Sequence, residues 1–74
     1  MRIEIDGDYI ELQQLLKLAG AAESGGHAKE LILSGKVKVG GITETRRSKK
    51  IRPGDIVRVE GVANVMEVAS RTEK

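Results

Sequence analysis

The sequence contains no cysteine, phenylalanine or tryptophan, and Tyr9 is its only aromatic residue. Without cysteine, the chain can form no disulfide scaffold, no thiolate nucleophile and no cysteine-based metal site. Small secreted domains usually need such cross-links, so we expect the protein to be cytoplasmic. No apolar run approaches the roughly 18 residues of a membrane-spanning helix, and we therefore expect no contact with a membrane.

Residues that carry catalysis are also scarce. His27 is the only histidine, and no second ligand motif lies near it, so we expect no bound metal. No nucleophile and base are arranged as an enzyme needs them. The glycines after Ser24 lack the Gly-Lys-Ser/Thr ending of a nucleotide-binding loop. We therefore predict that the protein is not an enzyme and uses no cofactor and no small-molecule substrate.

The 74 residues suffice for one small domain, whose core must be built from aliphatic side chains. We expect this domain to span residues 1–70 and to act as a monomer. Residues 71–74 are predicted to form a disordered tail.

Two helices are predicted in the first half of the chain. Apolar residues from Leu12 to Ala19 recur with helical spacing, and Gly20 is suited to end that helix. Ser24 has the character of an N-cap, which predicts a second helix that stops at Gly35.

The remaining segments alternate apolar and polar residues as strands do. Gly40-Gly41 favours a tight hairpin turn, and Pro53-Gly54-Asp55 favours another turn. The fold class is therefore predicted to be α+β, with two N-terminal helices packed on a small, mostly antiparallel sheet. The predicted strands are residues 2–5, 36–39, 42–45, 56–60 and 65–68.

Positive charge is concentrated in the middle third of the chain. Residues 29–52 hold eight basic and two acidic residues, a balance of +6, although the net charge of the whole chain is only +2. Such a distribution raises the local potential toward a polyanion. Four of the eight cations fall within five positions, at Arg46, Arg47, Lys49 and Lys50.

The second helix offers a different means of binding anions. The N-terminus of a helix has free N–H groups and a partial positive charge, which together favour phosphate. Gly25 and Gly26 would leave these groups accessible, unless they merely make the helix start flexible. His27 could donate to a phosphate or cap its own helix.

Several of these segments, in this order, resemble the alpha-L RNA-binding motif, named after small-subunit ribosomal protein S-four. The resemblance runs from about Glu11 to Glu60 and is greatest to short, stand-alone bacterial members, in which Thr43-Glu44-Thr45-Arg46-Arg47 follows the hairpin. The segments are Leu15-Leu16-Lys17-Leu18-Ala19-Gly20, Ser24-Gly25-Gly26-His27-Ala28-Lys29, Ile32, Gly35-Lys36-Val37-Lys38-Val39 and Pro53-Gly54-Asp55-Ile56-Val57.

The resemblance implies that RNA lies against the start of the second helix and the basic hairpin. Many family members carry arginine directly after the capping serine, where this chain has Gly25, so backbone N–H groups would replace that contact. Together with the local patterns, the resemblance gives these candidate RNA-binding residues: Ser24, Gly25, Gly26, His27, Lys29, Lys36, Lys38, Arg46, Arg47, Lys49 and Lys50.

The predicted function is therefore non-catalytic binding of structured RNA, either ribosomal or transfer RNA. The second helix is poor in cations for reading a DNA major groove, and the chain lacks aromatic platforms for single strands. The alternative is a protein-interaction module or ribosome-associated adaptor that holds an acidic partner on the sheet edge or the basic face.

Overall fold

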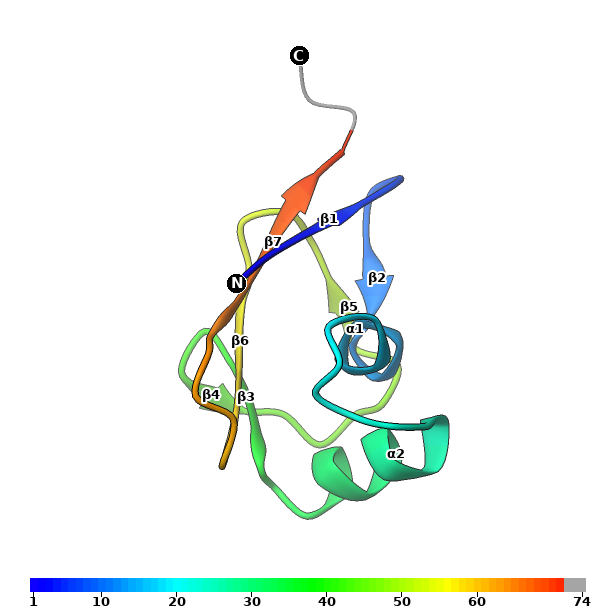
Figure 1. Ribbon diagram of the computed structural model, residues 1–74, viewed down its shortest axis with the longest axis vertical. Helices are drawn as coiled ribbons and strands as arrows, with labels where there is room; N and C mark the ends of the chain where they lie inside the picture. Colours follow the sequence, from blue (N-terminus) through cyan, green and yellow to red (C-terminus); the bar gives the residue numbers. More distant parts are fainter. Residues whose placement is uncertain (72–74) are drawn as a thin grey trace.

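The computed structural model describes residues 1–71 (Figure 1). Seven short strands and two helices follow one another along the chain. Their bounds are β1 Arg2–Ile5, β2 Ile10–Glu11, α1 Leu12–Leu18, α2 Gly25–Leu33, β3 Val37–Val39, β4 Ile42–Thr43, β5 Lys50–Ile51, β6 Ile56–Val59 and β7 Met66–Ser70.

The strands form a five-stranded sheet in the order β1-β7-β6-β3-β4 and a two-stranded sheet of β2 and β5. Every pairing is antiparallel except that of β1 with β7, which is parallel. The predicted α+β class with a mostly antiparallel sheet is confirmed. However, α1 and α2 follow β1 and β2 in the chain, so the helices lie between strands rather than before all of them.

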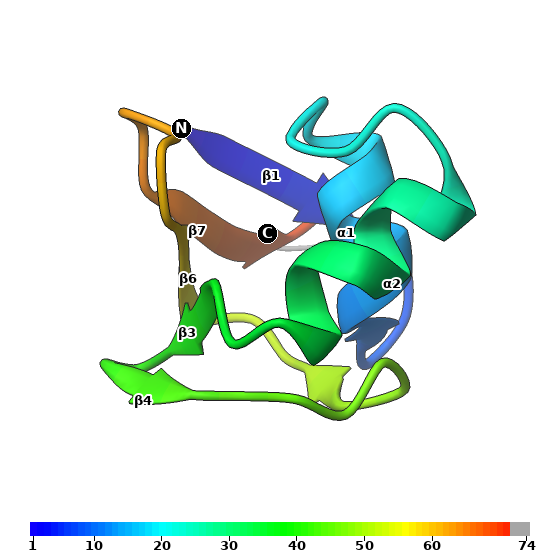
Figure 2. The same ribbon diagram turned by 90° about the horizontal axis from the view of Figure 1, so that it is seen from below.

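Both helices cover the same face of the five-stranded sheet (Figure 2). Strand alternation turns Val37, Val57 and Val59 toward the helices, where all three are buried. The helical stripe that the sequence predicts supplies Leu12, Leu15 and Leu16 from α1, and each of these leucines is fully buried. These contacts form the aliphatic core that we expect for a chain without phenylalanine or tryptophan.

Glycine ends both helices as predicted. Gly20 and Gly35 have φ angles of +79° and +80°, which residues with a side chain rarely adopt. At the other end of α2, the Ser24 side chain accepts a hydrogen bond from the His27 backbone N–H at 3.1 Å. Ser24 is therefore the N-cap that the sequence predicts.

Several boundaries differ from the sequence-based expectation. Strand β3 begins at Val37 rather than at residue 36, β6 ends at Val59 rather than at residue 60, and β7 begins at Met66 rather than at residue 65. The short strands β2 and β5 are not among the predicted strands.

The return strand of the hairpin is only β4, and after it the Glu44 N–H makes one more backbone hydrogen bond to the Val37 carbonyl. The basic segment that follows ends in the short strand β5. The last strand extends to Ser70, two residues beyond the prediction. Arg71 still donates its backbone N–H to the Ile5 carbonyl at 2.9 Å. The rest of the predicted tail, residues 72–74, lies outside the described residues.

Candidate nucleic-acid interface

Helix α2 begins with a reciprocal pair of hydrogen bonds. Besides the bond from the His27 N–H to Ser24, the Nδ1 atom of His27 accepts a hydrogen bond from the Glu23 backbone N–H at 3.0 Å. This arrangement is related to a capping box, but histidine takes the place of the usual glutamate or glutamine, and the donor is the N–H of the residue before the N-cap rather than that of the N-cap itself. The His27 side chain thus caps its own helix through Nδ1, and its Nε2–H remains as a donor for an external group.

The two glycines that begin α2 are not needed for packing within the described residues. A Cβ on Gly25 or Gly26 would meet its nearest neighbouring atoms only at 4.0 and 3.9 Å, which is ordinary van der Waals contact. Both glycines lie in the first turn of the helix, and no contact within the described residues requires a residue without a side chain there. Their N–H groups are open to approach, which is what the predicted phosphate contact requires.

Lys17 is an additional cation that the sequence-based list missed. It lies in the last turn of α1, and its Nζ is 4.0 Å from the position that a Cβ would take on Gly25. The connection between the helices folds back and brings the two together. The sequence offered no indication of this contact, because Lys17 falls in the acidic part of the chain.

Strands β3 and β6 carry cations on the face of the sheet that points away from the helices. Lys38 lies directly opposite Arg58 in the pairing register, and both are exposed. Like charges opposite one another across two strands repel. Within residues 1–71, neither side chain has a hydrogen-bond or ion-pair partner. Arg58 was not among the predicted site residues, although its outward position follows from the alternation in Ile56–Val59.

The basic segment, residues 46–50, is anchored to α1 by its own backbone. The Lys49 carbonyl accepts a hydrogen bond from the Leu12 N–H at 2.9 Å, and the Arg47 carbonyl accepts one from the Gln13 N–H at 3.1 Å. These are two of the N–H groups that the start of a helix leaves without an intrahelical acceptor. The cationic side chains of the segment are therefore held close to the start of α1.

Not all cations of the basic segment are free. The Arg46 guanidinium forms an ion pair with Glu44, with Nε at 3.0 Å from Oε2, and the Glu44 side chain is only 15% exposed. The hydrogen bond from Arg46 lowers the pKa of the Glu44 carboxyl below its ordinary value. The Lys50 ammonium lies 4.9 Å from the centre of the Tyr9 ring, which is 44% exposed. Tyr9 therefore contacts a cation of the basic segment.

The remaining predicted cations lie on the surface around these groups. Lys29 is exposed on α2, and Lys36 is exposed just before β3. In both views the chain between β4 and β5 passes along α2 (Figures 1 and 2). Three cations of this segment surround a hollow of about 340 Å³ together with Arg52, which was not among the predicted site residues; the lining is Arg46, Ser48, Lys49, Lys50 and Arg52.

Among residues 1–71, no three His, Cys, Asp or Glu side chains gather in a way that could hold a metal ion. None of the helices in that range is long and apolar enough to cross a membrane.

The sequence of the whole domain matches a known family. Residues 3–68 match the family described as the S4 domain. The chain belongs to the S4 domain family. This agrees with the resemblance to the alpha-L motif drawn from its segments, and the matched range includes every candidate site residue.

Two bacterial proteins are also similar to this chain in sequence. The probable ribosome maturation protein RlbA of Bacillus subtilis is 39% identical over 66 residues, covering 89% of this chain and 93% of the relative. The putative RNA-binding protein YbcJ of Escherichia coli is 49% identical over 53 residues, covering 72% and 76%. The similarity therefore extends over most of each chain rather than over one motif.

Proposed function

We propose that this protein binds folded RNA without catalysing a reaction, and that phosphate contacts supply most of the affinity. The observation that carries the proposal is the set of cations on β3, β6 and residues 46–50, which are exposed except for the half-buried Lys49 and of which only Arg46 is paired with a carboxylate in the described residues. Cations left without internal partners are available to neutralise phosphates and release their counterions.

The start of α2 would add a second mode of contact. Its first N–H groups lie next to two glycines, with the Nε2–H of His27 and the Lys17 ammonium nearby. A phosphate there would meet the positive end of the helix as well as a full charge. This contact would be made by backbone N–H groups at the start of the helix, in place of the arginine side chain that many proteins with this motif carry.

Folded RNA fits this surface better than DNA or an extended single strand. Helix α2 has nine residues and a single cation, Lys29, which is too little to read a DNA major groove. The only aromatic side chain is Tyr9, and Lys50 lies over one face of its ring, so the chain lacks the several aromatic platforms on which the successive bases of a single strand stack. Recognition through shape and phosphates is the mode that suits structured RNA.

The relatives' names support ribosomal RNA as the first RNA to test. One of them is named for ribosome maturation and the other for RNA binding. We expect this chain to act as a monomer in the cytoplasm and to contribute binding rather than chemistry to such a process.

A protein partner is the second candidate. The edge strand β4 exposes 74% of Ile42, and a free edge can accept a strand from another chain. However, β4 has only two residues, which gives a short ladder. Salt separates the two candidates, because strand pairing is far less sensitive to salt than phosphate contacts are.

The deciding experiment is a titration with total ribosomal RNA and with duplex DNA at low and at moderate salt. We expect RNA to bind more tightly than DNA, and log K to fall with log[salt] by about 0.7 to 0.9 for each phosphate engaged. The variant Arg47→Ala/Lys49→Ala should bind RNA more weakly. The slope of its log K against log[salt] should be shallower by the amount expected for one to two phosphates, at about 0.7 to 0.9 for each.

The matched control is Arg2→Ala/Arg71→Ala, which removes the same charge from the far side of the sheet at β1 and β7. If both double variants lose the same affinity, binding depends on net charge alone, and the proposed surface is wrong. If RNA affinity does not change with salt, a protein partner becomes the better candidate.

A further inference from the structure

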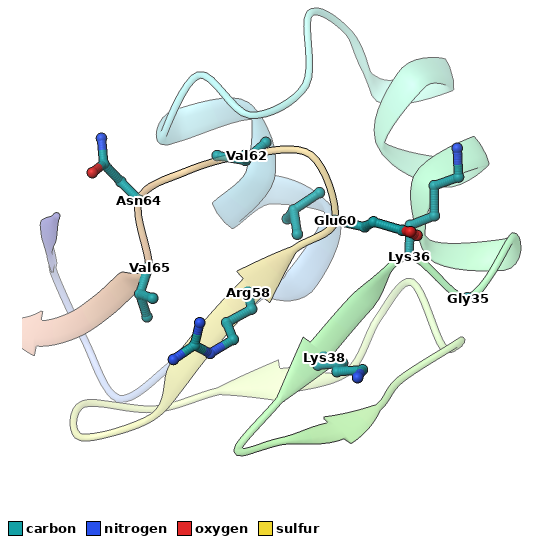
Figure 3. Close-up of a pocket in the computed structure, with 9 residues that line it drawn as sticks. Gly35, Lys36, Lys38, Arg58, Glu60, Val62, Asn64 and Val65 are labelled. Atoms are coloured by element: carbon teal, nitrogen blue, oxygen red, sulfur yellow. The ribbon is translucent and has the colours of Figure 1, made fainter.

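A hollow of about 480 Å³ lies on the outer face of the sheet, beside the chain that connects β6 to β7 (Figure 3). Its volume falls within the range of about 300 to 1,000 Å³ that is typical of small-ligand sites. Its walls come from two neighbouring strands and the connecting chain. The lining residues are Gly35, Lys36, Lys38, Arg58, Val59, Glu60, Val62, Asn64 and Val65.

Three cations border this hollow and lack internal partners. The side chains of Lys36, Lys38 and Arg58 make no hydrogen bond and no ion pair within the described part of the chain. Lys38 and Arg58 are also held opposite each other by the register of β3 and β6. An anion between them would relieve the repulsion of two like charges.

The rest of the lining differs in chemistry from this cationic end. Val62 and Val65 supply apolar surface from the connecting chain, and Glu60 follows directly after β6. Glu60 donates its backbone N–H to the Lys36 carbonyl at 2.8 Å, which places the two residues side by side. Its carboxylate has no partner of its own within residues 1–71.

The spacing of these groups matches a ligand with an anionic end and a flat, polar-edged end. Arg58 and Glu60 are two residues apart, which corresponds to about 7 Å along an extended chain. A phosphate at Lys38 and Arg58 would therefore be separated from the Glu60 carboxylate, which would otherwise repel it. A base could lie between these two ends.

We infer that this hollow holds one unpaired nucleotide of the bound RNA, with its phosphate at Lys38 and Arg58 and the edge of its base at Glu60. The inference rests on the proposed function and adds a point of base recognition to a surface that otherwise contacts phosphates. Unpaired nucleotides are the parts of RNA whose base edges a protein can reach.

Glu60 also determines which base would be favoured. An ionised carboxylate only accepts hydrogen bonds, with two oxygens that suit two adjacent donors. Guanine presents such a pair on its Watson–Crick edge, an N–H beside an amino group. Uracil presents one N–H between two carbonyl oxygens, which a carboxylate repels. Guanine should therefore bind best and uracil worst.

The test is a titration of the isotope-labelled full chain, followed by its amide NMR spectrum, with the four ribonucleoside 5′-monophosphates up to tens of millimolar. Ribose 5-phosphate serves as the probe without a base. We expect shifts at Lys36, Lys38, Arg58 and residues 60–65. GMP should bind roughly three- to tenfold more tightly than UMP, and ribose 5-phosphate should bind more weakly than GMP.

Two variants separate the two ends of the hollow. Arg58→Gln should weaken all four nucleotides by roughly three- to tenfold, because it removes a phosphate contact. Glu60→Gln should bring GMP and UMP close together in affinity, because a carboxamide both donates and accepts. Both residues are exposed, so the fold should be preserved, and each variant's spectrum reports this directly. The matched control is Arg71→Gln, at the far end of β7, which should change neither affinity nor base order.

Three results would overturn the inference: no shifts in the hollow at any concentration, equal binding of ribose 5-phosphate and GMP, or a base order that Glu60→Gln leaves unchanged. The RNA titration keeps the two proposals distinguishable. If the wild type binds RNA while no nucleotide perturbs the hollow, the RNA-binding proposal stands and this inference fails. If RNA does not bind either, both fail.

Discussion

The cations of residues 46–50 and those of β3 and β6 differ in how many of them contact other groups of the protein. In the basic segment, Arg46 is paired with Glu44 and Lys50 lies over Tyr9. On the strands, Lys38 and Arg58 face each other without a partner in the described residues. The segment has the greater density of positive charge along the sequence, whereas the strands have the greater share of cations that are free to bind a ligand.

This difference shows that the density of positive charge along a sequence overstates how many cations of a segment are available to bind a ligand. Part of the charge of the basic segment goes into holding the segment in shape, through the ion pair at Glu44 and the contact with Tyr9. The strands need no such help, because the backbone ladder and the buried valines on the opposite face fix their outward residues. Three changes would test this contrast.

The largest effect is expected where the basic segment meets the core. Ile51, in β5, is fully buried and pairs with Ile10 at the end of this segment. Ile51→Ala should lower the free energy of unfolding by about 2 to 5 kcal/mol, because it removes buried methyl groups and leaves a cavity. Urea unfolding followed by far-ultraviolet circular dichroism measures this loss. Ile56→Ala is the control, since Ile56 is 43% exposed and should cost under about 1 kcal/mol. Equal losses would contradict this assignment of the anchor.

The second change compares the two groups of cations at equal charge. One variant replaces Lys36, Lys38 and Arg58 with glutamine, and the other replaces Arg47, Lys49 and Lys50. We expect both to weaken RNA binding, and the strand variant to do so by roughly a further three- to tenfold, because all three of its cations lack internal partners, whereas Lys50 of the other variant lies over Tyr9 and Lys49 is half-buried. Binding isotherms at a single salt concentration measure the ratio. A larger loss in the variant of the basic segment would reverse the contrast.

The smallest effect is expected from freeing Arg46. Because the folded-state pKa of Glu44 is lowered, its ion pair stabilises the basic segment at pH values above the unfolded-state pKa of the carboxyl. That stability is lost as the pH falls through the folded-state value. Glu44→Gln should abolish the dependence and raise RNA affinity by about twofold at neutral pH, since it removes one negative charge. The Arg46 Nε resonance, followed against pH in both proteins, is the measurement. An Arg46 signal that titrates identically in both would show that Glu44 is not its partner.

Much of the fold could be predicted because it follows from local patterns. The stripe of Leu12, Leu15 and Leu16 needed only helical spacing, and the cap at Ser24 needed only its side-chain oxygen. The parallel pairing of β1 with β7 could not be predicted, because it joins opposite ends of the chain. Candidate site residues could be predicted where a cation belonged to a recognisable segment of the sequence. The prediction missed Lys17, Arg52 and Arg58, because these residues join the other cations only through contacts between elements that are distant in the sequence.

The sequence by itself determined the two helices, the longer strands with the side of each that is buried, and the total positive charge of the middle third. These depend on periodicities of a few residues and on counting. Only the tertiary structure decided which cations are left free. It brought Arg58 opposite Lys38, and it attached the basic segment to the start of α1 through backbone carbonyls. Charge availability depends on neighbours across space, and strand register and chain reversal create those neighbours without leaving a local pattern.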